Sequence, residues 1–398
     1  MAVLISAAIS TAYANARKLV RLADGTIYCV YSKSPNGAWQ IYIKKSVDDG
    51  LTWTGETLLS TYAGMDTRTQ VVPAIAADSS GNLHVVWHGF ATGFAKYQIW
   101  YTKFNGIWSE TVRISDKDGM TGDHQRYPSI AVDESDNVHV VWDGVATGFA
   151  LAQIYYTKYD GSWSAPLRIS TLALMQNYEQ AQASIAIDSL GYLHVTWWGK
   201  ATGFTGWNQV WYTKYDGSWS APLRISTLAQ MQNYSQAGIS IAIDSNNFVH
   251  VVFYGAVTGG ASRIWYTKYD GSWSAPLQIS TLAGMDAFQQ QFPTVAIDAS
   301  DNVHVVWYGK SNAYPTFQTI FYAKYTGSWA VEYLQSAGVD LTSPNCRWSL
   351  IPAGNIPFAG MSYTFHDPTY VYYDAKDIPT PPKRMIGLNP AFMEVLGL

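Results

Sequence analysis

The chain has 398 residues, of which 48% are hydrophobic and only 14% are charged, and its formal net charge is -4. This charge argues against a protein that binds nucleic acid through phosphate contacts. No apolar run approaches the roughly 20 residues that a membrane-spanning helix needs. Aromatic residues make up 15% of the chain, and such residues favour strands over helices.

The first segment, MAVLISAAISTAYANA, has an apolar run before Ala-Tyr-Ala, as a secretory signal does. It lacks the basic residues with which such signals begin. Ala2–Ser6 instead matches the pattern of a strand that recurs later in the chain. We therefore expect this segment to supply a strand of the fold and not to act as a signal peptide.

The chain contains two cysteines, Cys29 and Cys346. A chain of this size can bury enough apolar surface to fold without a disulfide framework. Two interpretations remain open: two buried thiols, which we prefer, or one bridge that joins the first and last repeats.

The dominant feature of the sequence is a segment that repeats, seen most clearly at Tyr156–Ser170 as YTKYDGSWSAPLRIS. Its other copies are Tyr212–Ser226, Tyr266–Ser280, Tyr101–Ser115, Tyr322–Ser336 and the divergent Lys44–Ser60. The tryptophans of successive copies lie 54 to 56 residues apart, at Trp53, Trp108, Trp163, Trp219, Trp273 and Trp329. A fixed period of this size indicates an array of equal supersecondary units.

Each period contains four short apolar runs separated by turns. Examples are Ser184–Asp188 for the first run, the His-Val-Val-Trp type for the second, Gln153–Lys158 for the third and Ala165–Ser170 for the fourth. Four short strands per period, repeated along the chain, describe the blades of a β-propeller.

The number of blades follows from the complete periods and from what remains at the two ends. Five periods are centred on His84, His139, His194, His250 and His304, and an earlier one has Tyr28 in that place. A degenerate last unit offers candidate strands at Trp348–Pro352, Phe358–Tyr363 and Tyr370–Ala375, and Ala2–Ser6 supplies its missing fourth strand. We therefore predict an all-β fold, a seven-bladed β-propeller of four-stranded antiparallel blades over residues 1–376, closed by the N-terminal strand so that no edge is exposed. Six blades with an irregular C-terminal region is the alternative.

Residues 377–398 have a different composition. Asp377–Lys383 is a proline-rich linker, and Asn389-Pro390 has the pattern of a helix start. The following short segment carries Phe392, Met393, Val395 and Leu396. A helix this short needs packing partners, so we expect it to dock either on the propeller's own face or on a partner in a larger assembly.

Ser46–Trp53 reads Ser-Val-Asp-Asp-Gly-Leu-Thr-Trp and fits the Asp-box pattern Ser-x-Asp-x-Gly-x-Thr-Trp, of which the other copies are shortened versions. The Ser and Asp side chains can bond the turn's own backbone, and Gly supplies a positive φ. The chain thus resembles the sialidase-like Asp-box (BNR-repeat) propellers over residues 1–376. The resemblance implies that these turns lie on the face opposite the usual binding face, and it says little about function.

Family sialidases have three arginines that bind the substrate carboxylate, a Tyr–Glu nucleophile pair and an Asp acid/base. The resemblance offers Arg17, Arg126 and Arg347 as carboxylate-binding residues, although Arg17 lacks the surrounding Arg-Ile-Pro motif. Glycoside hydrolysis needs paired carboxyl groups in a set geometry, and no Tyr–Glu pair is recognisable. We therefore assign no catalytic residue and expect no enzyme activity.

The recurrent histidines come from different blades, so they lie on a ring and do not meet at one ion. We expect them to bond the backbone of the adjacent blade. The aspartates that end the first runs, Asp78, Asp133, Asp188, Asp244 and Asp298, are expected to be turn residues. No metal site and no cofactor is predicted.

The loops of the opposite face combine uncharged amides with aromatic rings, as sugar recognition requires. The candidate glycan-binding residues are Trp207, Asn208, Gln176, Asn177, Tyr178, Gln232, Asn233, Tyr234, Phe94, Phe149 and Phe204. Repeated sites would raise the avidity of a weak single site. The competing interpretation is recent duplication, with the Phe residues and Met175, Met231 and Met285 packing between blades.

The sequence thus predicts a non-catalytic recognition or adhesion propeller that binds cell-surface glycans or polysaccharides, outside the cell or on a virion surface. The C-terminal segment would attach it to an assembly such as a bacteriophage tail or capsid. The alternatives are a sialidase-type glycoside hydrolase and a purely structural virion or scaffold protein.

Overall fold

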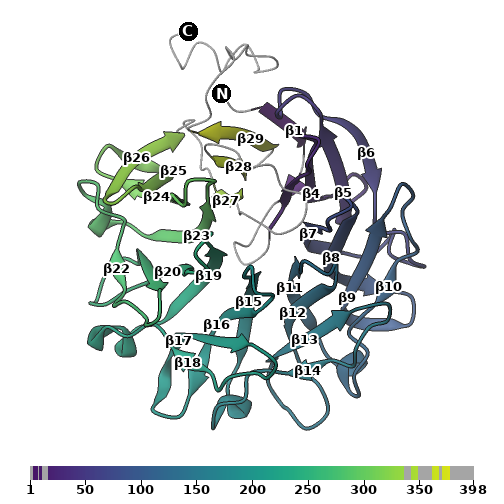
Figure 1. Ribbon diagram of the computed structural model, residues 1–398, viewed down its shortest axis with the longest axis horizontal. Coiled ribbons are helices and arrows are strands. Elements are labelled where there is room, and N and C mark those ends of the chain that lie inside the picture. The colour runs from purple at the N-terminus through teal and green to yellow at the C-terminus, as the bar shows by residue number, and fades with distance from the viewer. Residues whose placement is uncertain are drawn as a thin grey trace.

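The computed structural model describes the backbone of residues 3–7, 9–10, 17–335, 342–347, 361–366 and 370–376, and the side chains of residues 17–333. Its strands form separate antiparallel sheets that are arranged around a central axis, as Figure 1 shows. The protein is therefore an all-β β-propeller with four-stranded antiparallel blades, as the sequence predicts.

Six blades follow one another in chain order between β2 and β26. The first blade contains β2 (Ile9–Ser10), β3 (Leu19–Arg21), β4 (Ile27–Lys33), β5 (Gln40–Ser46) and β6 (Thr54–Leu58), with β2 and β3 both paired to β4. The second contains β7 (Gln70–Ala77), β8 (Leu83–Ala91), β9 (Phe94–Phe104) and β10 (Val112–Arg113). The third contains β11 (Gln125–Val132), β12 (Val138–Gly144), β13 (Gln153–Tyr159) and β14 (Leu167–Arg168).

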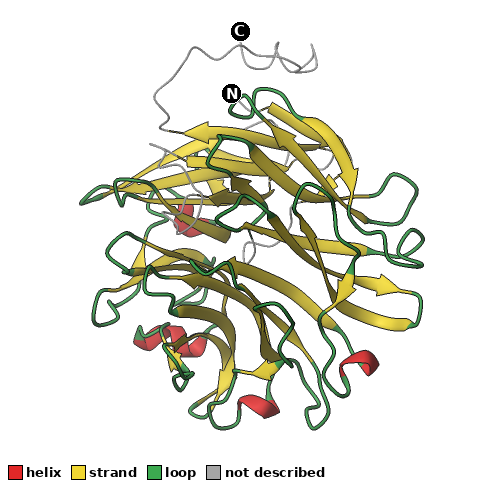
Figure 2. Ribbon diagram, turned by 45° about the vertical axis from the view of Figure 1, so that its right-hand side comes forward, coloured by secondary structure: helices red, strands yellow, loops and turns green. Residues whose placement is uncertain are grey.

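The last three of these blades have the same order of strands. The fourth contains β15 (Gln180–Ile187), β16 (Leu193–Ala201), β17 (Phe204–Tyr215) and β18 (Leu223–Arg224). The fifth contains β19 (Gln236–Ile243), β20 (Val249–Gly255), β21 (Arg263–Tyr269) and β22 (Leu277–Gln278). The sixth contains β23 (Gln290–Ile297), β24 (Val303–Ser311), β25 (Tyr314–Tyr325) and β26 (Trp329–Gln335). Short 3-10 helices lie in the loops before the third to sixth blades, namely η1 (Met120–Gly122), η2 (Met175–Asn177), η3 (Ala229–Asn233) and η4 (Met285–Ala287), drawn red in Figure 2.

A further sheet, here called the closing sheet, is formed by β27 (Thr342–Arg347), β28 (Met361–His366), β29 (Tyr370–Lys376) and β1 (Val3–Ala7), in that order. β27 contacts β23 and β24 on one side and β3 on the other, and Figure 1 places the sheet between the sixth and first blades. The strands from β2 to β26 form six blades, which is the number of the alternative prediction and not the seven that the sequence favoured. The seventh blade stays a prediction that rests on the backbone pairing of the closing sheet. Trp348–Pro352, where a strand was predicted, lies outside the described residues, and the edge strand is Thr342–Arg347 instead.

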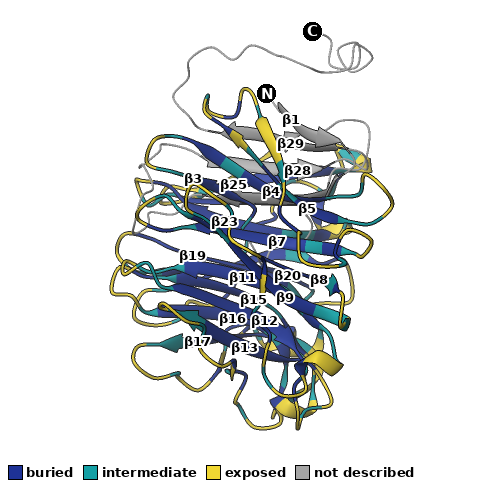
Figure 3. Cartoon of the chain, turned by 90° about the vertical axis from the view of Figure 1, so that its right-hand side faces the viewer, coloured by how far each residue is buried: buried dark blue, intermediate teal, exposed yellow. Residues whose placement is uncertain are grey.

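The first strand of each blade lies nearest the axis. β7, β11, β15, β19 and β23 contact one another in succession, and their burial is visible as the dark band through Figure 3. Loops between blades and loops between second and third strands share one side, here called the loop face. For example, the Thr202 N–H donates to the carbonyl of Ala173 at 3.1 Å. The Asp-Gly turns lie on the opposite side, here called the turn face.

In the second to sixth blades, a buried glutamine at the start of the first strand fixes the loop face of the blade. In the fourth blade, Gln180 Oε1 accepts a hydrogen bond from Trp197 Nε1 at 3.0 Å, and Gln180 Nε2 donates to the carbonyl of Lys200 at 2.8 Å. A Cβ on Gly199 would lie 2.1 Å from that Oε1, so the second strand needs glycine beside the amide. Equivalent glutamines are Gln70, Gln125, Gln236 and Gln290, all fully buried.

A second buried glutamine joins each of several blades to the loop that leads into the next. Gln153 Nε2 donates to the carbonyl of Met175 at 3.1 Å, and Ser170 Oγ donates to Gln153 Oε1 at 3.0 Å. Gln98 and Gln209 do the same with Met120 and Met231. Met175 itself is buried among residues of the third and fourth blades. The prediction that these methionines pack between blades is therefore confirmed.

The recurrent histidines have a structural role, but not the one predicted. In the third blade, His139 Nδ1 lies 2.9 Å from Tyr156 Oη, and His139 Nε2 lies 3.1 Å from Asp133 Oδ2. All three groups belong to one blade, so the expectation that the histidines bond the adjacent blade is wrong. The reason is that the third-strand Tyr lies within reach on the neighbouring strand.

The aspartates that end the first strands are turn residues, as predicted. Asp133 Oδ1 accepts from the backbone N–H groups of Ser135 and Asn137. Burial alone would raise the pKa of the Asp133 carboxyl, but hydrogen bonds from His139 and Asn137 outweigh it and lower the pKa to about 2.

The turn at Ser46–Trp53 has the hydrogen bonds that its sequence predicts. Ser46 Oγ accepts from the Gly50 N–H at 2.8 Å, and Asp48 Oδ1 accepts from the Thr52 N–H at 2.8 Å. Gly50 has a φ of 85°, and Trp53 Nε1 donates to its carbonyl at 3.1 Å. The turn therefore fastens the third strand of the first blade to the fourth.

Cys29 is a fully buried free thiol on β4, and burial raises its pKa. The side chain of Cys346 lies outside the described residues. No helix in the described part of the chain is long and apolar enough to cross a membrane.

Trp197→Phe should lower the stability of the protein, because it leaves the buried Gln180 Oε1 without its donor. An orphaned buried acceptor costs about 1–3 kcal/mol, and the lost ring volume adds to this. The measurement is the urea midpoint of unfolding.

Trp198→Phe is the matched control, because Trp198 Nε1 donates to Gln182 Oε1 at 3.0 Å in a half-buried place where water can replace it. Equal losses in the two variants would contradict this account. The fifth blade already has Phe253 at the Trp197 position, and its Gln236 Oε1 is a buried acceptor without a hydrogen-bond partner.

Candidate functional site

The predicted amide residues lie together on the loop face in two equivalent copies. Gln176 and Asn177 on η2 are exposed, and Tyr178 beside them is half-buried. Gln232, Asn233 and Tyr234 have the same exposure at η3. The loops are held from below by the buried methionines and by the glutamine bonds to their carbonyls. Two stiff loops therefore present the same amides to solvent.

The three predicted phenylalanines are half-buried and have partners in their own blades. The guanidinium groups of Arg113, Arg168 and Arg224 lie 4.9, 4.6 and 4.0 Å from the ring centres of Phe94, Phe149 and Phe204, respectively. Phe204 also meets Trp211 edge to face at 6.1 Å. Since arginine covers one face of each ring, only the remaining ring surface is open to a ligand.

Trp207 is the most exposed of the predicted aromatic residues, with 49% of its surface accessible. It lies in the hairpin of β16 and β17, beside the half-buried Asn208. The equivalent hairpin of the sixth blade carries Phe317, which is 41% exposed. Phe317 escaped the sequence reasoning because its loop lacks the Ala-Thr-Gly-Phe signature, although its place in the repeat could have identified it.

A second group of residues lies where the first strands enter the loop face. There the pairing of first and second strands shifts register in five blades. The shifted residues have positive φ angles: Val72 (55°), Tyr127 (53°), Gln182 (55°), Gly238 (58°) and Phe292 (49°). Such a conformation costs an L-residue about 1–3 kcal/mol and is often found at functional sites. Each bulge re-aims one side chain near the axis.

Two of the bulges place a backbone hydrogen-bond donor against a titratable residue of the preceding blade. The Tyr127 N–H donates to His88 Nδ1 at 3.1 Å, and the Gln182 N–H donates to Asp143 Oδ1 at 3.0 Å. His88 and Asp143 occupy equivalent positions on the second strand, directly before Gly89 and Gly144. A cluster of titratable groups is thus built at the junction of the second, third and fourth blades.

Arg126 and Asp143 form the centre of this cluster. Arg126 Nε lies 3.7 Å from Asp143 Oδ2, and Arg126 Nη2 lies 3.5 Å from Glu179 Oε1. The first distance is too long for a hydrogen bond, and both atoms are buried without a hydrogen-bond partner among the described residues. Buried unpaired polar atoms are uncommon in native proteins, so this ion pair is only partly satisfied by hydrogen bonds.

Burial shifts the ionisation of the cluster strongly. Desolvation raises the pKa of the Asp143 carboxyl to about 7, although the Gln182 N–H and the Arg126 charge oppose the shift. Desolvation and the charges of Arg126, Lys18 and His124 lower the pKa of His88 to about 3. Burial likewise lowers the pKa of Lys18 to about 7, against the influence of Cys29. Near neutral pH, His88 is therefore a neutral acceptor, and Asp143 is available as a proton donor.

Of the three arginines suggested by the sialidase resemblance, the structure places Arg126 in this cluster with two carboxyl partners. The carbonyl of Arg17 accepts a hydrogen bond from the Ile75 N–H at 3.0 Å, and the side chain of Arg347 lies outside the described residues. Convergence of the three arginines stays a prediction. Among the residues described, no group of three or more His, Cys, Asp or Glu residues could hold a metal ion.

Sequence reasoning missed His88, Asp143 and Lys18. His88 and Asp143 directly follow the repeated His-Val-Val-Trp motif, at a position that varies among the blades and holds Trp198, Tyr254 and Tyr308 in the next three. Variation at one position of an otherwise regular repeat was the signal that could have found them.

No protein-family model matches the chain. No curated protein is similar to it in sequence. Solved structures share the fold at low identity.

A protein of unknown function from Dyadobacter fermentans is 11% identical, with a TM-score of 0.53 over 80% of this chain and 97% of its own. The polysaccharide lyase Uly1 is 10% identical, with a TM-score of 0.57 over 92% of this chain and 90% of its own. A Hadza microbial sialidase is 8% identical, with a TM-score of 0.49 over 85% of this chain and 73% of its own. At these identities the likeness to the first two structures concerns the fold alone.

Asp143→Asn should change how stability depends on pH. The pKa of Asp143 is higher in the folded protein (about 7) than in the unfolded chain, where it is about 3.9. Between these values the folded state holds the extra proton, so rising pH lowers the stability of the wild type, by at most about 1.4 kcal/mol per pH unit. The variant lacks this contribution.

The measurement is the free energy of unfolding of both proteins from pH 4 to pH 8. The wild type should lose stability relative to the variant between about pH 4 and pH 7, and the two curves should run parallel above that. Parallel curves over the whole range would mean that Asp143 is not protonated in the folded protein.

Proposed function

We propose that this propeller is a non-catalytic recognition module that binds glycans at several equivalent sites on its loop face. The observation that carries the proposal is the repeated presentation of exposed amides at η2 and η3, together with the exposed ring of Trp207 on β17, the strand that contacts η3. Phe317 presents an exposed ring at the equivalent place of the sixth blade. Amides donate and accept hydrogen bonds with sugar hydroxyls. A flat ring gives the apolar face of a pyranose a surface to stack on.

The rigidity of the loops supports binding. The exposed residues Gln176 and Asn177 follow Met175, whose side chain is buried and whose carbonyl is held by Gln153 and Gln180. Loops that are ordered before the ligand arrives lose little conformational entropy on binding. Two or more such sites on one ring would add avidity to a weak single-site affinity.

The contacts of Arg126 favour binding over sialidase-type hydrolysis. The Arg126 guanidinium already lies 3.5 Å from Glu179 Oε1, so a substrate carboxylate would compete with that carboxyl group, even though Arg126 Nε has no hydrogen-bond partner among the described residues. A Tyr–Glu pair does occur, since Tyr31 Oη donates to Glu56 Oε1 at 2.6 Å. Tyr31, however, is fully buried within the first blade, where its hydroxyl has no access to a sugar.

The closing sheet is proposed to act as a seventh blade. β1 is far from β27–β29 in the sequence yet pairs with β29, so the two ends of the chain are fastened within one sheet. Such an arrangement protects the edges that an open ring would expose. The purely structural role stays the second candidate, because a closed and stiff ring also serves as a building block.

We also propose that residues 377–398 attach the ring to a larger assembly, outside the cell or on a virion surface such as that of a bacteriophage. Their proline-rich linker and short apolar segment are the features that support this. The linker would hold the ring at a distance from its attachment point.

Trp207→Ala should weaken glycan binding and leave the fold intact, because the ring is half exposed and lies at a hairpin tip. The binding free energy lost with one ring that stacks on a sugar should be similar to that of an aromatic pair, about 0.5–1.5 kcal/mol. This corresponds to a few-fold weaker binding at one site. The measurement is a glycan array followed by titration with the best sugar.

Phe317→Ala tests the equivalent hairpin, and the double variant tests multivalency. If both sites act together, the double variant should lose more binding to a dense glycan surface than either single variant. Ile107→Ala on the turn face is the control, since Ile107 is 78% exposed but lies far from the loop-face hairpins in the blade. Unchanged binding in the double variant would remove both hairpins from the proposal, and a flat array would leave the structural role.

A chain that ends at residue 376 should remain a folded ring but fail to join its assembly. The measurements are the thermal midpoint and the mass in solution, compared with those of the full chain. An insoluble truncated product would show instead that the C-terminal segment belongs to the core.

A further inference from the structure

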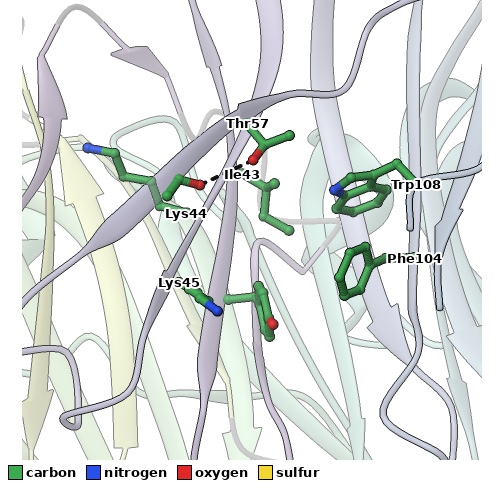
Figure 4. A pocket seen from close by; sticks show the side chains of 8 residues that line it. Ile43, Lys44, Lys45, Thr57, Phe104 and Trp108 are labelled. Atoms are coloured by element: carbon green, nitrogen blue, oxygen red, sulfur yellow. Dashed lines mark hydrogen bonds between the residues drawn. The ribbon is translucent and has the colours of Figure 1, made fainter. Parts of the chain in front are cut away.

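A pocket of about 260 Å³ lies on the turn face, at the junction of the first and second blades. The first blade lines it with Ile43, Lys44, Lys45 and Thr57, and the second blade with Phe104 and Trp108 (Figure 4). It is separate from the loop face, where the proposed glycan sites and the Arg126 cluster lie.

The pocket exists because one ring of the repeat is missing. At four other junctions the third-strand Tyr of one blade meets the turn Trp of the next edge to face. These pairs are Tyr101–Trp163 (4.9 Å), Tyr156–Trp219 (5.1 Å), Tyr212–Trp273 (4.8 Å) and Tyr266–Trp329 (4.9 Å). In the first blade Ile43 stands at the place of the Tyr, since it pairs with Val30 as Tyr101 pairs with Val86. Trp108 therefore has no such partner, and the volume of the absent ring is left open.

A second change accompanies the first. In the other blades the third-strand Tyr bonds a second-strand His, as Tyr101 bonds His84. The first blade has Tyr28 at the place of that His, and Tyr28 lines the pocket. Burial and the nearby Asp24 raise the pKa of Tyr28, so its phenol stays neutral. Among the six blades with described side chains, only the first thus lacks both the His and the Tyr of this structural pair.

The pocket combines an aromatic wall with one available cation. Figure 4 shows the rings of Phe104 and Trp108 on one side of the space and Lys45 on the other. The two rings are 5.1 Å apart and tilted by 45°. Lys44 Nζ lies 3.8 Å from Glu56 Oε1, whereas the exposed Lys45 makes no ion pair with any residue that the structure describes. Lys45 is therefore the group that can receive an anion.

We infer that this junction pocket binds a single acidic sugar unit, a pyranose that carries a carboxylate. The sugar's apolar face would stack on the Trp108 ring, and its carboxylate would accept a charge-assisted hydrogen bond from Lys45. Thr57 Oγ1 and the Tyr28 hydroxyl can bond the ring hydroxyls. The volume is below that of pockets for drug-sized ligands, which begin near roughly 300 Å³, so one ring fits.

The test uses the full chain with ¹⁵N-labelled tryptophans, and the Trp108 indole signal is assigned with Trp108→Phe. Three probes are titrated: methyl β-D-glucuronide, methyl β-D-glucoside, which lacks the charge, and benzoate, which has the charge without the sugar. The glucuronide should shift the Trp108 signal and bind at least about tenfold more tightly than either other probe, as loss of one charge-assisted hydrogen bond predicts.

Two variants locate the site. Ile43→Tyr restores the ring found at the other junctions and should abolish binding by filling the pocket. Lys45→Met removes the charge on an exposed side chain, so it should keep the fold and weaken glucuronide binding at least about tenfold. Lys158→Met changes the equivalent lysine of the third blade and should leave binding unchanged.

Glucuronide binding that survives both Ile43→Tyr and Lys45→Met would overturn the inference, as would benzoate binding as tightly as glucuronide. Absence of any shift at millimolar glucuronide would overturn it too. Trp207→Ala should leave this binding intact, so the junction pocket and the loop-face proposal can fail independently of each other.

Discussion

The buried glutamines are the interaction on which the rest of the loop face depends. Gln180 bonds a tryptophan and a second-strand carbonyl of its own blade, and Gln153 bonds the loop that leads into the next blade. Each amide is fully buried, so an unmet bond would cost far more than a surface bond contributes. Because loops such as those at η2 and η3 are tied to such amides, the exposed residues on them are held in place from below. A regular core therefore supports variable surface chemistry.

The same arrangement explains why strain is tolerated near the axis. Tyr127 and Gln182 hold positive φ angles, and their N–H groups bond His88 and Asp143 in return. The surrounding first strands are packed against one another, which over-determines the bulge. The consequence is electrostatic as well as conformational. The side chains of Asp143, His88 and Lys18 are all buried, and burial shifts each pKa in the direction that favours the neutral form of the group. Burial of this kind is typical of functional sites and also of structural ones.

The period of the sequence is sufficient to predict the strands, the blades and the turn chemistry, because each of these is set by local residues that recur. The turn at Ser46–Trp53 forms the hydrogen bonds that its sequence predicts, and the aspartates end their strands as expected. Contacts between strands are less visible in a sequence. The partner of His139 proved to be Tyr156 of its own blade, since the partner depends on which face of the sheet each side chain takes. The contact of Arg224 with the Phe204 ring could not be foreseen either, because Arg224 lies on a strand of only two residues.

In a ring built from near-identical units, the positions that carry particular chemistry are those where one unit departs from the others. Residues that most blades share, such as the buried glutamines, maintain the fold and do not distinguish one part of the ring from another. The departures are local: Asp143 among rings and an imidazole on the loop face, and Ile43 among tyrosines on the turn face. Each creates something that the regular unit lacks, an unpaired buried polar atom in one case and an open volume in the other. Substitutions that restore the repeat at these positions therefore test function more sharply than alanine does, because the restored residue already fits its place elsewhere in the same molecule.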